Sequence, residues 1–518
     1  EQDPPPSSNM SLGPKDRSLW TPEERLADTL MTVTSKSAGN QPFFEGKIPW
    51  KSGHHLRLLN NFHAVELRQT RTHSTESLRK KGIADSEIDT IIDNYLTKNY
   101  IEIVPTGEEG FGWYLPFFEV VNRHKSTPVR LVFDAKAKYK GVSLNQQILD
   151  TPNRLNDLTL VLSRMRTHRF VLAGDITEMF LQIRLHPDDK QFHRFTHKGQ
   201  HFQWTRTLFG NKASPNLSQK VLDELCKANP KLQEACETVT KSCYMDDCID
   251  SRDSEEEMLA LAEQLPELLK CAGMRICKMY TNNQRVLESI NPQLRAQGFD
   301  LQDRGAIFEE QRVLGLMYNA SKDELAFSVK HKTVESWKNS LALTCWTKRG
   351  VLKAIASHYD PLGLASPITI RPRRLLQKIW TTSIGWDDPL PREIQRDWEN
   401  ALSELLRLES LSFPRWIGGT KGSKRQMHVY CDASEGTYAC AIYLRNEDGT
   451  GVSVGLLGAK ARVTHIKVQS VSRSELDACV LGTRMARHFN AIYQLGKDQV
   501  FFYTDSRNAL FWITSTPK

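Results

Sequence analysis

Short apolar runs between polar turns predict several strands in the first half of the chain. Longer stretches, in which apolar residues recur at helical spacing, predict helices between them. Strands and helices are mixed without a repeated strand–helix–strand period, so we predict an α+β fold for this part. The predicted strands are residues 100–105, 117–122, 129–135, 169–176 and 180–185, and the predicted helices are residues 155–168, 213–228 and 254–273.

The pattern differs toward the two ends of the chain. Residues 1–14 are rich in proline and serine, which predicts a disordered start. Residues 19–96 have a helical pattern with polar breaks, and residues 56–81 have the pattern of one long basic surface helix. After the Gly- and Lys-rich residues 417–426 a new series begins, which indicates a second domain. It predicts strands at residues 426–434 and 438–445, a helix at 472–488, a strand at 499–506 and a final helix.

Composition narrows the function classes only slightly. The 518 residues carry a formal net charge of +8, which fits a polyanionic partner but also many ordinary enzymes. No apolar run approaches the roughly 20 residues needed to cross a bilayer, and the chain starts without a secretory leader. The 10 cysteines are scattered, none as Cys-x-x-Cys. We therefore expect no zinc finger and interpret the cysteines as reduced thiols of an intracellular protein.

Two adjacent aspartates in KSCYMDDCID, residues 241–250, raise a question of chemistry. Adjacent carboxylates repel each other, and such a pair usually lies on a solvated turn. Asp175, however, closes the apolar strand 169–176, and a tight hairpin would hold Asp246 and Asp247 at its tip. If the two strands are neighbours, the carboxylates converge, and a cation is needed to stabilise the cluster. Hard oxygen ligands favour Mg²⁺, and two such ions can clamp the attacking and leaving oxygens of a phosphoryl transfer.

Motifs on both sides of these aspartates favour the metal site over the solvated turn. Together they resemble the reverse transcriptases of the Bel-Pao class of long-terminal-repeat retrotransposons, over about residues 48–518. No single motif is specific, but the set in this order is. The motifs are PWKSGHHLRLLNNFHAVELR, YLPFFEVV, VRLVFDAKAKYKGVSLNQQIL, FVLAGDITEMFLQIRLHPDDKQFHRF, TLFGNKASP, YMDDCIDS, KMYTN, RVLGLMY, HYDPLGLASPITI and GWDDPLP.

The resemblance implies an architecture and an activity. It implies the reverse transcriptase and ribonuclease H region of a Pol polyprotein, a nucleotidyltransferase that adds deoxynucleotides to a primer on an RNA or DNA template. The implied fold is a right-hand polymerase followed by a truncated α/β ribonuclease H-like domain. The expected boundaries are 1–47 for a disordered or extended segment, 48–320 for fingers and palm, 321–424 for thumb and tether, and 425–518 for the ribonuclease H-like domain.

By motif, Asp175, Asp246 and Asp247 take the places of the family's catalytic, metal-binding aspartates. These would hold two Mg²⁺ ions, with Mn²⁺ as a substitute. Phe180 takes the place of an aromatic gate that leaves no room for a ribose 2′-hydroxyl, although a core phenylalanine is the plainer interpretation. Arg130 resembles the fingers arginine that grips the incoming deoxynucleoside triphosphate, since a guanidinium suits bidentate phosphate contact.

Further motif positions imply contacts with the nucleotide and the primer. The family's companion fingers lysine has no clear match, and Arg123 and Lys125 are the nearest cations. The resemblance implies that Phe209 and Gly210 form the floor of the nucleotide pocket and that Met245 lies beneath the primer terminus. It implies a primer grip formed by Leu314, Gly315 and Leu316. Lys278 takes the place of a proton donor to pyrophosphate, although an exposed strand lysine is the plainer interpretation.

A second set of carboxylates falls in the predicted C-terminal domain. Asp432 closes a strand, Glu475 stands near a helix start and Asp505 ends another strand, an order that resembles a ribonuclease H. Paired Mg²⁺ ions would here activate water against an RNA phosphodiester. The family carries a fourth carboxylate, and usually a histidine, further on, and the sequence stops at Lys518 before either. We therefore expect an incomplete site with little ribonuclease H activity.

A run of histidines suggests a different metal site. His193, His197 and His201 recur at every fourth residue, which on a helix would form a metal-binding face. An HKGQ turn, however, separates alternating aromatic runs in this stretch. We therefore predict a β-hairpin and expect no zinc there.

Two rival functions have weaker support. An aspartic protease needs Asp-[Ser/Thr]-Gly, and no such triplet occurs in the sequence. A host-adopted copy that binds nucleic acid or forms particles without polymerising stays as the alternative, although the intact aspartates, Phe180 and Arg130 argue against it. We expect no membrane partner and a cytoplasmic location within the element's virus-like particles. The sequence does not indicate an oligomeric state.

Overall fold

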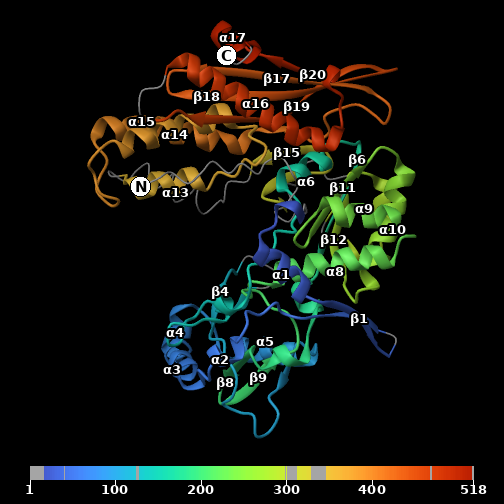
Figure 1. Cartoon of the computed structure of the whole chain (residues 1–518), viewed down its shortest axis with the longest axis vertical. Helices are drawn as coiled ribbons and strands as arrows, with labels where there is room; N and C mark the ends of the chain where they lie inside the picture. Colours follow the sequence, from blue (N-terminus) through green and yellow to red (C-terminus); the bar gives the residue numbers. More distant parts are fainter. Residues whose placement is uncertain are drawn as a thin grey trace.

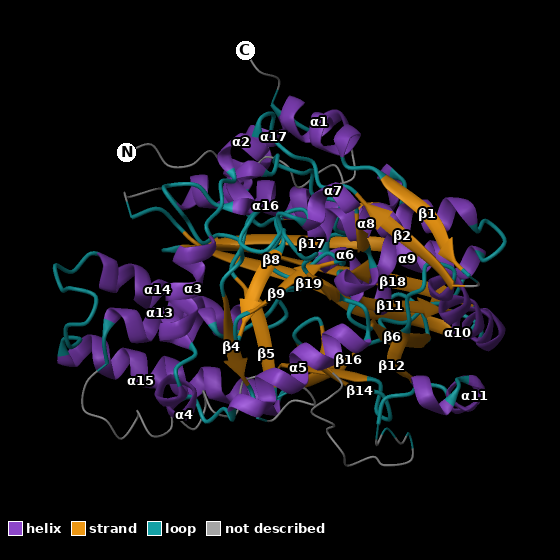
Figure 2. Cartoon of the chain, turned by 90° about the horizontal axis from the view of Figure 1, so that it is seen from below, coloured by secondary structure: helices purple, strands orange, loops and turns teal. Residues whose placement is uncertain are grey.

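The computed structural model describes residues 17–39, 41–123, 128–297, 299, 301, 312–327, 346–466 and 470–515. The chain runs from a mixed body at one end, through a central sheet, to a bundle of helices and a second sheet at the other end (Figure 1). Seen from below, α13, α14 and α15 gather on the side opposite α9 and α10 (Figure 2). Among the described helices, none has the length and hydropathy of a membrane-spanning segment.

The lower end in Figure 1, where the ribbon runs from blue to green, is built around small sheets with an aromatic core. One sheet has the order β3-β9-β8 and another pairs β4 with β5. The Phe133 ring lies 5.0 Å from both Phe195 and Trp204, measured between centroids. The elements of this end are α2 (His54–Arg57), α3 (Phe62–Thr72), α4 (Thr75–Lys80), α5 (Asp85–Thr97), β3 (Ile101–Ile103), β4 (Phe117–Val121), β5 (Val129–Phe133), α7 (Pro187–Lys190), β8 (Arg194–His197) and β9 (Gln200–Trp204).

The single long helix predicted over residues 56–81 is wrong, because the structure divides it into α2, α3 and α4. The side chain of Asn61 bonds both the N–H and the carbonyl of Tyr114, at 2.7 and 2.8 Å, which favours a break before α3. Ser74 accepts a hydrogen bond from the Ser77 N–H and so caps a new helix. Local side-chain bonds therefore override the helical period.

We expected residues 1–47 to be disordered or extended. The structure describes this segment from residue 17 onward, and there the expectation is wrong. Helix α1 (Pro22–Leu30) begins with a capping box, and β1 (Val33–Ala38) pairs with β2 (Gln41–Gly46). Tertiary contacts hold this segment in place, because Arg154 and Lys220 both pair with Asp28. The sequence of the stretch does not indicate these contacts, because the partner residues come from far along the chain.

The central sheet has the strand order β10-β11-β6-β12, and helices pack against it. Its apolar residues form one core with α8, α9 and α10. The strand predicted over residues 180–185 is mostly wrong: a 3-10 turn covers Met179–Gln182, and only β7 (Arg184–Leu185) is extended. The elements are α6 (Leu158–Met165), β6 (Phe170–Ile176), α8 (Ser214–Ala228), α9 (Gln233–Ser242), β10 (Cys243–Tyr244), β11 (Asp247–Arg252), α10 (Glu255–Lys270), β12 (Ile276–Thr281) and α11 (Gln284–Ser289).

A small sheet and three helices follow the central sheet. The sheet has the order β13-β14-β15-β16, so its last strand returns from beyond the helices. Trp346 and Trp398 meet edge to face at 5.3 Å inside this part. The elements are β13 (Arg312–Val313), β14 (Leu316–Asn319), β15 (Glu324–Phe327), α13 (Lys348–Ala356), α14 (Ser366–Trp380), α15 (Arg392–Leu406) and β16 (Ser412–Pro414).

The C-terminal sheet has the order β19-β18-β17-β20, with β17 and β20 parallel and the long helix α16 packed across it. The sequence reading missed β19, in which Gly451, Gly455 and Gly458 interrupt the apolar alternation. Helix α16 also packs against α6, where His488 pairs with Asp157 at 3.2 Å. The elements are β17 (Lys424–Ser434), β18 (Thr437–Asp448), β19 (Gly451–Val463), α16 (Val471–Tyr493), β20 (Val500–Tyr503) and α17 (Arg507–Thr514).

Candidate active sites

The three aspartates singled out in the first half of the chain meet at one end of the central sheet. β6 and β11 pair antiparallel, with Asp247 directly opposite Asp175. Asp246 lies in the tight turn between β10 and β11, and its carbonyl accepts a 2.8 Å hydrogen bond from the Ile176 N–H. The predicted hairpin and the predicted pairing of the two strands are thus both present.

The turn that carries Asp246 is strained and cross-linked. Met245 has a φ of 55°, in the left-handed region that a side chain of its size seldom occupies. Cys243 and Cys248 face each other across the hairpin and are joined by a disulfide. This corrects the expectation that all cysteines are reduced thiols. The two cysteines are five residues apart and become adjacent only through the hairpin, so the sequence has no Cys-x-x-Cys pattern that would predict the disulfide.

Burial and mutual repulsion disfavour the charged form of this cluster. Burial raises the pKa of Asp247 to about 7, and the charges of Asp246 and Asp175 contribute to the rise. Burial likewise raises the pKa of Asp246, while Lys278 and Arg130 oppose that rise. Such hard oxygen donors, crowded and short of positive charge, fit a divalent cation such as Mg²⁺.

Two of the residues expected to contact the nucleotide, Phe180 and Phe209, contact each other, and a third, Gly210, lies against the end of β5. The Phe180 side chain is 8% exposed and its ring lies 4.7 Å from that of Phe209, which is 53% exposed. Gly210 has a φ of 95°, and a Cβ built there would lie 2.6 Å from the Phe133 carbonyl oxygen. Only glycine therefore fits at this position.

The predicted cations have different surroundings. Arg130 is exposed on β5, and its charge opposes the rise in the pKa of Asp246. Arg123 forms a two-point ion pair with Glu87, at 2.6 and 3.1 Å, which occupies its guanidinium. Lys125 lies outside the described residues. Lys278 is exposed at an irregularity of β12, with a φ of 54°, and its charge opposes the pKa rise of both turn aspartates.

The hairpin expected to be the primer grip approaches the same turn. Leu314 and Gly315 form its tip between β13 and β14, with φ of 47° and 93°. A Cβ on Gly315 would lie 2.6 Å from the Tyr359 ring. Burial raises the pKa of Tyr359 and Tyr244 contributes to the rise, so the two tyrosines are neighbours. The sequence reading did not single out Tyr359, although it stands in the motif HYDPLGLASPITI.

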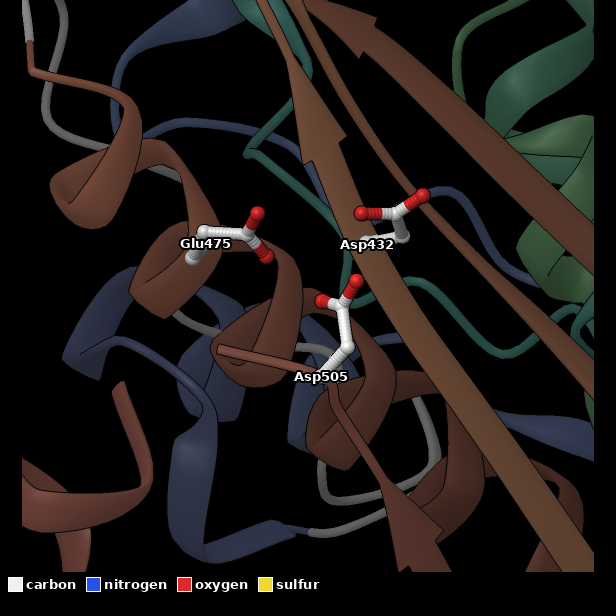
Figure 3. Close-up of side chains that lie close together, drawn as sticks. All are labelled: Asp432, Glu475 and Asp505. Atoms are coloured by element: carbon white, nitrogen blue, oxygen red, sulfur yellow. The ribbon is translucent and has the colours of Figure 1, made fainter. Parts of the chain in front are cut away.

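The second carboxylate cluster also assembles. One oxygen from each of Asp432, Glu475 and Asp505 lies within 4.8 Å of the others. Figure 3 shows the three carboxylates turned toward one another, with Glu475 on a helix and Asp432 on a strand. Burial raises the pKa of Glu475, and the charges of Asp432 and Asp505 raise it further. This cluster has the chemistry of a divalent cation site.

Family models match the two parts of the chain that hold these clusters. The model "Reverse transcriptase (RNA-dependent DNA polymerase)" matches residues 123–282, and the model "Pao retrotransposon-like RNaseH-like domain" matches residues 347–506. The chain contains a reverse transcriptase domain and a Pao retrotransposon-like ribonuclease H-like domain. Its activity class is accordingly RNA-directed DNA polymerase. The second match also covers α13, α14 and α15, within the range 321–424 that the sequence reading assigned to thumb and tether.

Solved structures show the same overall fold. The foamy viral protease-reverse transcriptase dRH in complex with double-stranded DNA matches with a TM-score of 0.52 and 16% identity, over 84% of this chain and 70% of that chain. The foamy viral protease-reverse transcriptase in complex with double-stranded DNA matches with a TM-score of 0.52 and 16% identity, over 82% and 83%. At this identity the likeness concerns the fold alone. No curated protein matches the sequence well enough to serve as a relative.

In the reverse transcriptase domain, the β-hairpin that the sequence predicted is formed by β8 and β9, which carry His197 and His201, and His193 directly precedes β8. Each ring already has a protein partner. His193 bonds the Asp189 carbonyl and Asn211, His197 pairs with Asp89, and His201 bonds the Tyr114 hydroxyl. The three histidines therefore serve the packing of this body.

The metal-free reverse transcriptase domain should lose stability as pH rises from about 4 to about 7. The pKa of Asp247 is about 7 in the folded protein against an ordinary 3.8, so in this window the folded state holds a proton that the unfolded chain has lost. Above the window the loss is complete. Thermal unfolding midpoints in EDTA should therefore depend less on pH in Asp247→Asn than in the parent chain.

The exposed Asp188→Asn serves as the matched control, since its side chain is 68% exposed. It should follow the parent curve. Parallel curves for Asp247→Asn and the parent would show that Asp247 ionises normally in the folded protein.

Proposed function

We propose that Asp175, Asp246 and Asp247 form the catalytic site for DNA synthesis on an RNA or DNA template. The observation that carries this proposal is the pairing of β6 with β11, which sets Asp247 opposite Asp175 beside the turn of Asp246, and the pKa values of Asp246 and Asp247 are raised. The reverse transcriptase match covers all three residues. We further propose that the chain belongs to the Bel-Pao class, that deoxynucleoside triphosphates are its substrates and that it works inside the element's particles. Nothing observed favours the alternative of a non-polymerising derivative.

The aspartates would hold two Mg²⁺ ions, which when bound would activate the primer 3′-hydroxyl and stabilise charge on the phosphate. The residues around them do the positioning. Arg130 would bind the triphosphate through its guanidinium. The Phe180 ring would limit the space beside the sugar, since it is buried against Phe209 and cannot move away freely. Lys278 would supply positive charge, and a proton, near the leaving group.

A basic track beside the second carboxylate cluster offers a path for the duplex. Burial lowers the pKa of Lys460, and the charges of Arg462 and Arg373 lower it further, so these cations gather despite their repulsion. A Cβ on Gly436, just past the strand of Asp432, would lie 3.1 Å from the Arg374 guanidinium. Among the described residues, none of these four cations forms an ion pair. Nucleic-acid phosphates are the anions that would satisfy them.

The cluster of Asp432, Glu475 and Asp505 would hold a divalent cation for cleavage of RNA paired with DNA. Its support is the approach of the three carboxylates in the ribonuclease H-like domain. Bound metal would supply an activated water. Asp432 and Asp505 are exposed, which leaves the site open to a large substrate.

Asp246→Asn should abolish primer extension, because it removes a charge from the proposed metal site. Duplex affinity should stay close to that of the parent, since phosphate contacts supply most of it. Extension on a primed RNA template and binding to the same duplex measure the two effects. The exposed Asp188→Asn should extend normally, and full extension by Asp246→Asn would refute the site.

Phe180→Val should allow the enzyme to incorporate ribonucleotides, because the smaller side chain leaves room for a 2′-hydroxyl. The ratio of kcat/KM for deoxynucleotides over ribonucleotides should fall by at least about tenfold, or ~1.4 kcal/mol in discrimination. Phe209→Val tests whether loss of any ring in the pair suffices. An unchanged ratio in Phe180→Val would place the gate elsewhere.

Replacing Arg373, Arg374 and Lys460 with glutamine should reduce the salt dependence of duplex binding. Each lost phosphate contact lowers the slope of log affinity against log salt by about 0.9, so a fall of roughly 2–3 is expected. Arg371→Gln is the matched control, because Arg371 pairs with Glu404 on the same helix bundle. A slope equal to that of the parent would exclude the track from the duplex path.

A further inference from the structure

Tyr359, which the proposed mechanism does not use, contacts an element of the polymerase site. It stands between α13 and α14, and its side chain is 39% exposed. A Cβ built on Gly315 would lie 2.6 Å from two carbon atoms of its ring, so the ring packs directly on the backbone of the hairpin tip. Burial raises the pKa of Tyr359, and Tyr244 contributes to the rise. The ring therefore touches the hairpin tip and lies close to the strand that leads to Asp246.

The hairpin of β13 and β14 is held against the central sheet. Val313 and Leu316, on either side of its tip, share one apolar core with Ile249 of β11. Burial raises the pKa of Tyr280, a residue of the same core, and the charge of Asp247 raises it further. The tip of the hairpin is thus fixed close to the polymerase aspartates.

Hydrogen bonds also fix the turn that carries Tyr359. The carboxylate of Asp360 accepts hydrogen bonds from the two backbone N–H groups that precede α14, at 2.9 and 2.8 Å. The Leu362 carbonyl accepts a 2.9 Å hydrogen bond from the N–H of Ala459 in β19. A Cβ on Gly363 would overlap the carbonyl oxygen of Ala459, so the two backbones are in direct contact. The turn is therefore fixed against the C-terminal sheet.

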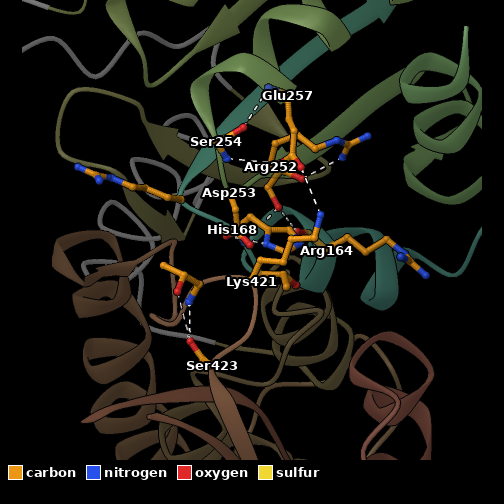
Figure 4. Close-up of polar contacts among 12 residues, drawn as sticks. Arg164, His168, Arg252, Asp253, Ser254, Glu257, Lys421 and Ser423 are labelled. Atoms are coloured by element: carbon orange, nitrogen blue, oxygen red, sulfur yellow. Dashed lines mark hydrogen bonds and ion pairs between the residues drawn. The ribbon is translucent and has the colours of Figure 1, made fainter. Parts of the chain in front are cut away.

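The C-terminal sheet is in turn attached to the part of the chain that carries the aspartates. Arg166, at the end of α6, donates a 3.1 Å hydrogen bond to the Leu457 carbonyl of β19. Lys421, just before β17, pairs with Glu257 of α10 at 3.5 Å, and Figure 4 shows it reaching toward that residue. The position of the turn of Tyr359 is thus set by the hairpin tip that it touches and by the sheet behind it.

The free surface of Tyr359 suits a contact with a nucleic-acid strand. Its hydroxyl forms no hydrogen bond among the residues that the structure describes. A phenolic hydroxyl can donate to a phosphate oxygen, which is the commonest kind of contact that positions a strand on a protein. The hairpin tip that the ring touches is the expected primer grip, so a primer bound there would lie next to the ring.

We infer that Tyr359 positions the primer, with its hydroxyl donating a hydrogen bond to a phosphate near the primer 3′ end. This inference rests on the proposed polymerase function and adds to it a residue from the helical part of the chain. The ring backs the tip at Gly315, so a strand that lies on the tip also reaches the tyrosine. Tyr359 thereby helps to hold the 3′-hydroxyl in line with the aspartates and takes no part in the chemistry.

Tyr359→Phe tests this inference, because phenylalanine keeps the packing on Gly315 and removes only the hydroxyl. The kcat/KM for a primed RNA template should fall by about tenfold, or ~1.4 kcal/mol, whereas the KM for the deoxynucleotide should not change. Tyr430→Phe is the matched control, since Tyr430 is 46% exposed and lies on β17 of the C-terminal sheet. It should extend primers as the parent does, and the unfolding midpoints of both variants should equal that of the parent.

A chemical substitution in the primer locates the contact. A methylphosphonate, which lacks the phosphate charge, replaces the linkages next to the primer 3′ end one at a time. At one linkage it should weaken extension by the parent without further weakening extension by Tyr359→Phe, because both changes remove the same hydrogen bond. Independent losses at every linkage would overturn the inference.

Asp246→Asn, assayed alongside, separates this inference from the proposed function on which it rests. Extension by Asp246→Asn would refute the polymerase site itself. Loss of extension in Asp246→Asn together with parental kcat/KM in Tyr359→Phe would overturn only the role of Tyr359, and would leave the tyrosine as a residue that packs the hairpin tip.

Discussion

The pairing register of β6 and β11 is the constraint on which the polymerase site depends. It sets Asp247 opposite Asp175 and leaves Asp246 in the turn just beyond. A slip of one residue would move every side chain of a strand to the other face, so Asp247 would leave the face of Asp175, and Ile249 would leave the core that it shares with Val171. The core thus specifies the register, and the register specifies the site. The disulfide between Cys243 and Cys248 closes the hairpin that carries this turn.

The two carboxylate clusters differ in how strongly their charges destabilise the folded state. The one on the central sheet is half-buried and raises the pKa of Asp247 to about 7, so the apo protein keeps it partly protonated near neutral pH. In the second, Asp432 and Asp505 are exposed, and only Glu475 is buried. Water screens the repulsion there. The unscreened charges of the first cluster therefore destabilise the folded state more than those of the second. Metal binding at the first cluster would bring the larger gain in stability.

Two buried arginines join the parts of the chain that carry the clusters. Arg415, whose side chain is fully buried, donates to the carbonyls of His168 and Arg169 and pairs with Asp323. Arg166 donates to the carbonyls of Arg415 and Leu457, each at 3.1 Å. These bonds connect the end of α6 to the small sheet and to the C-terminal sheet. A guanidinium can satisfy several carbonyls at once, so each arginine removes a set of otherwise unpaired buried groups.

The amino-acid sequence by itself determined the strands that lead to Asp175, Asp432 and Asp505, because short apolar runs followed by aspartate are local signals. It also determined the hairpin around Asp246 and, through its motifs, the two domains that family models match. Only the tertiary structure decided that residues 17–47 fold, since the partners of Asp28 lie far along the chain. The cross-link between Cys243 and Cys248 and the contact of Gly315 with Tyr359 were likewise settled by packing. These features depend on distances between residues remote in sequence or on strand register, and no local pattern of side chains encodes them.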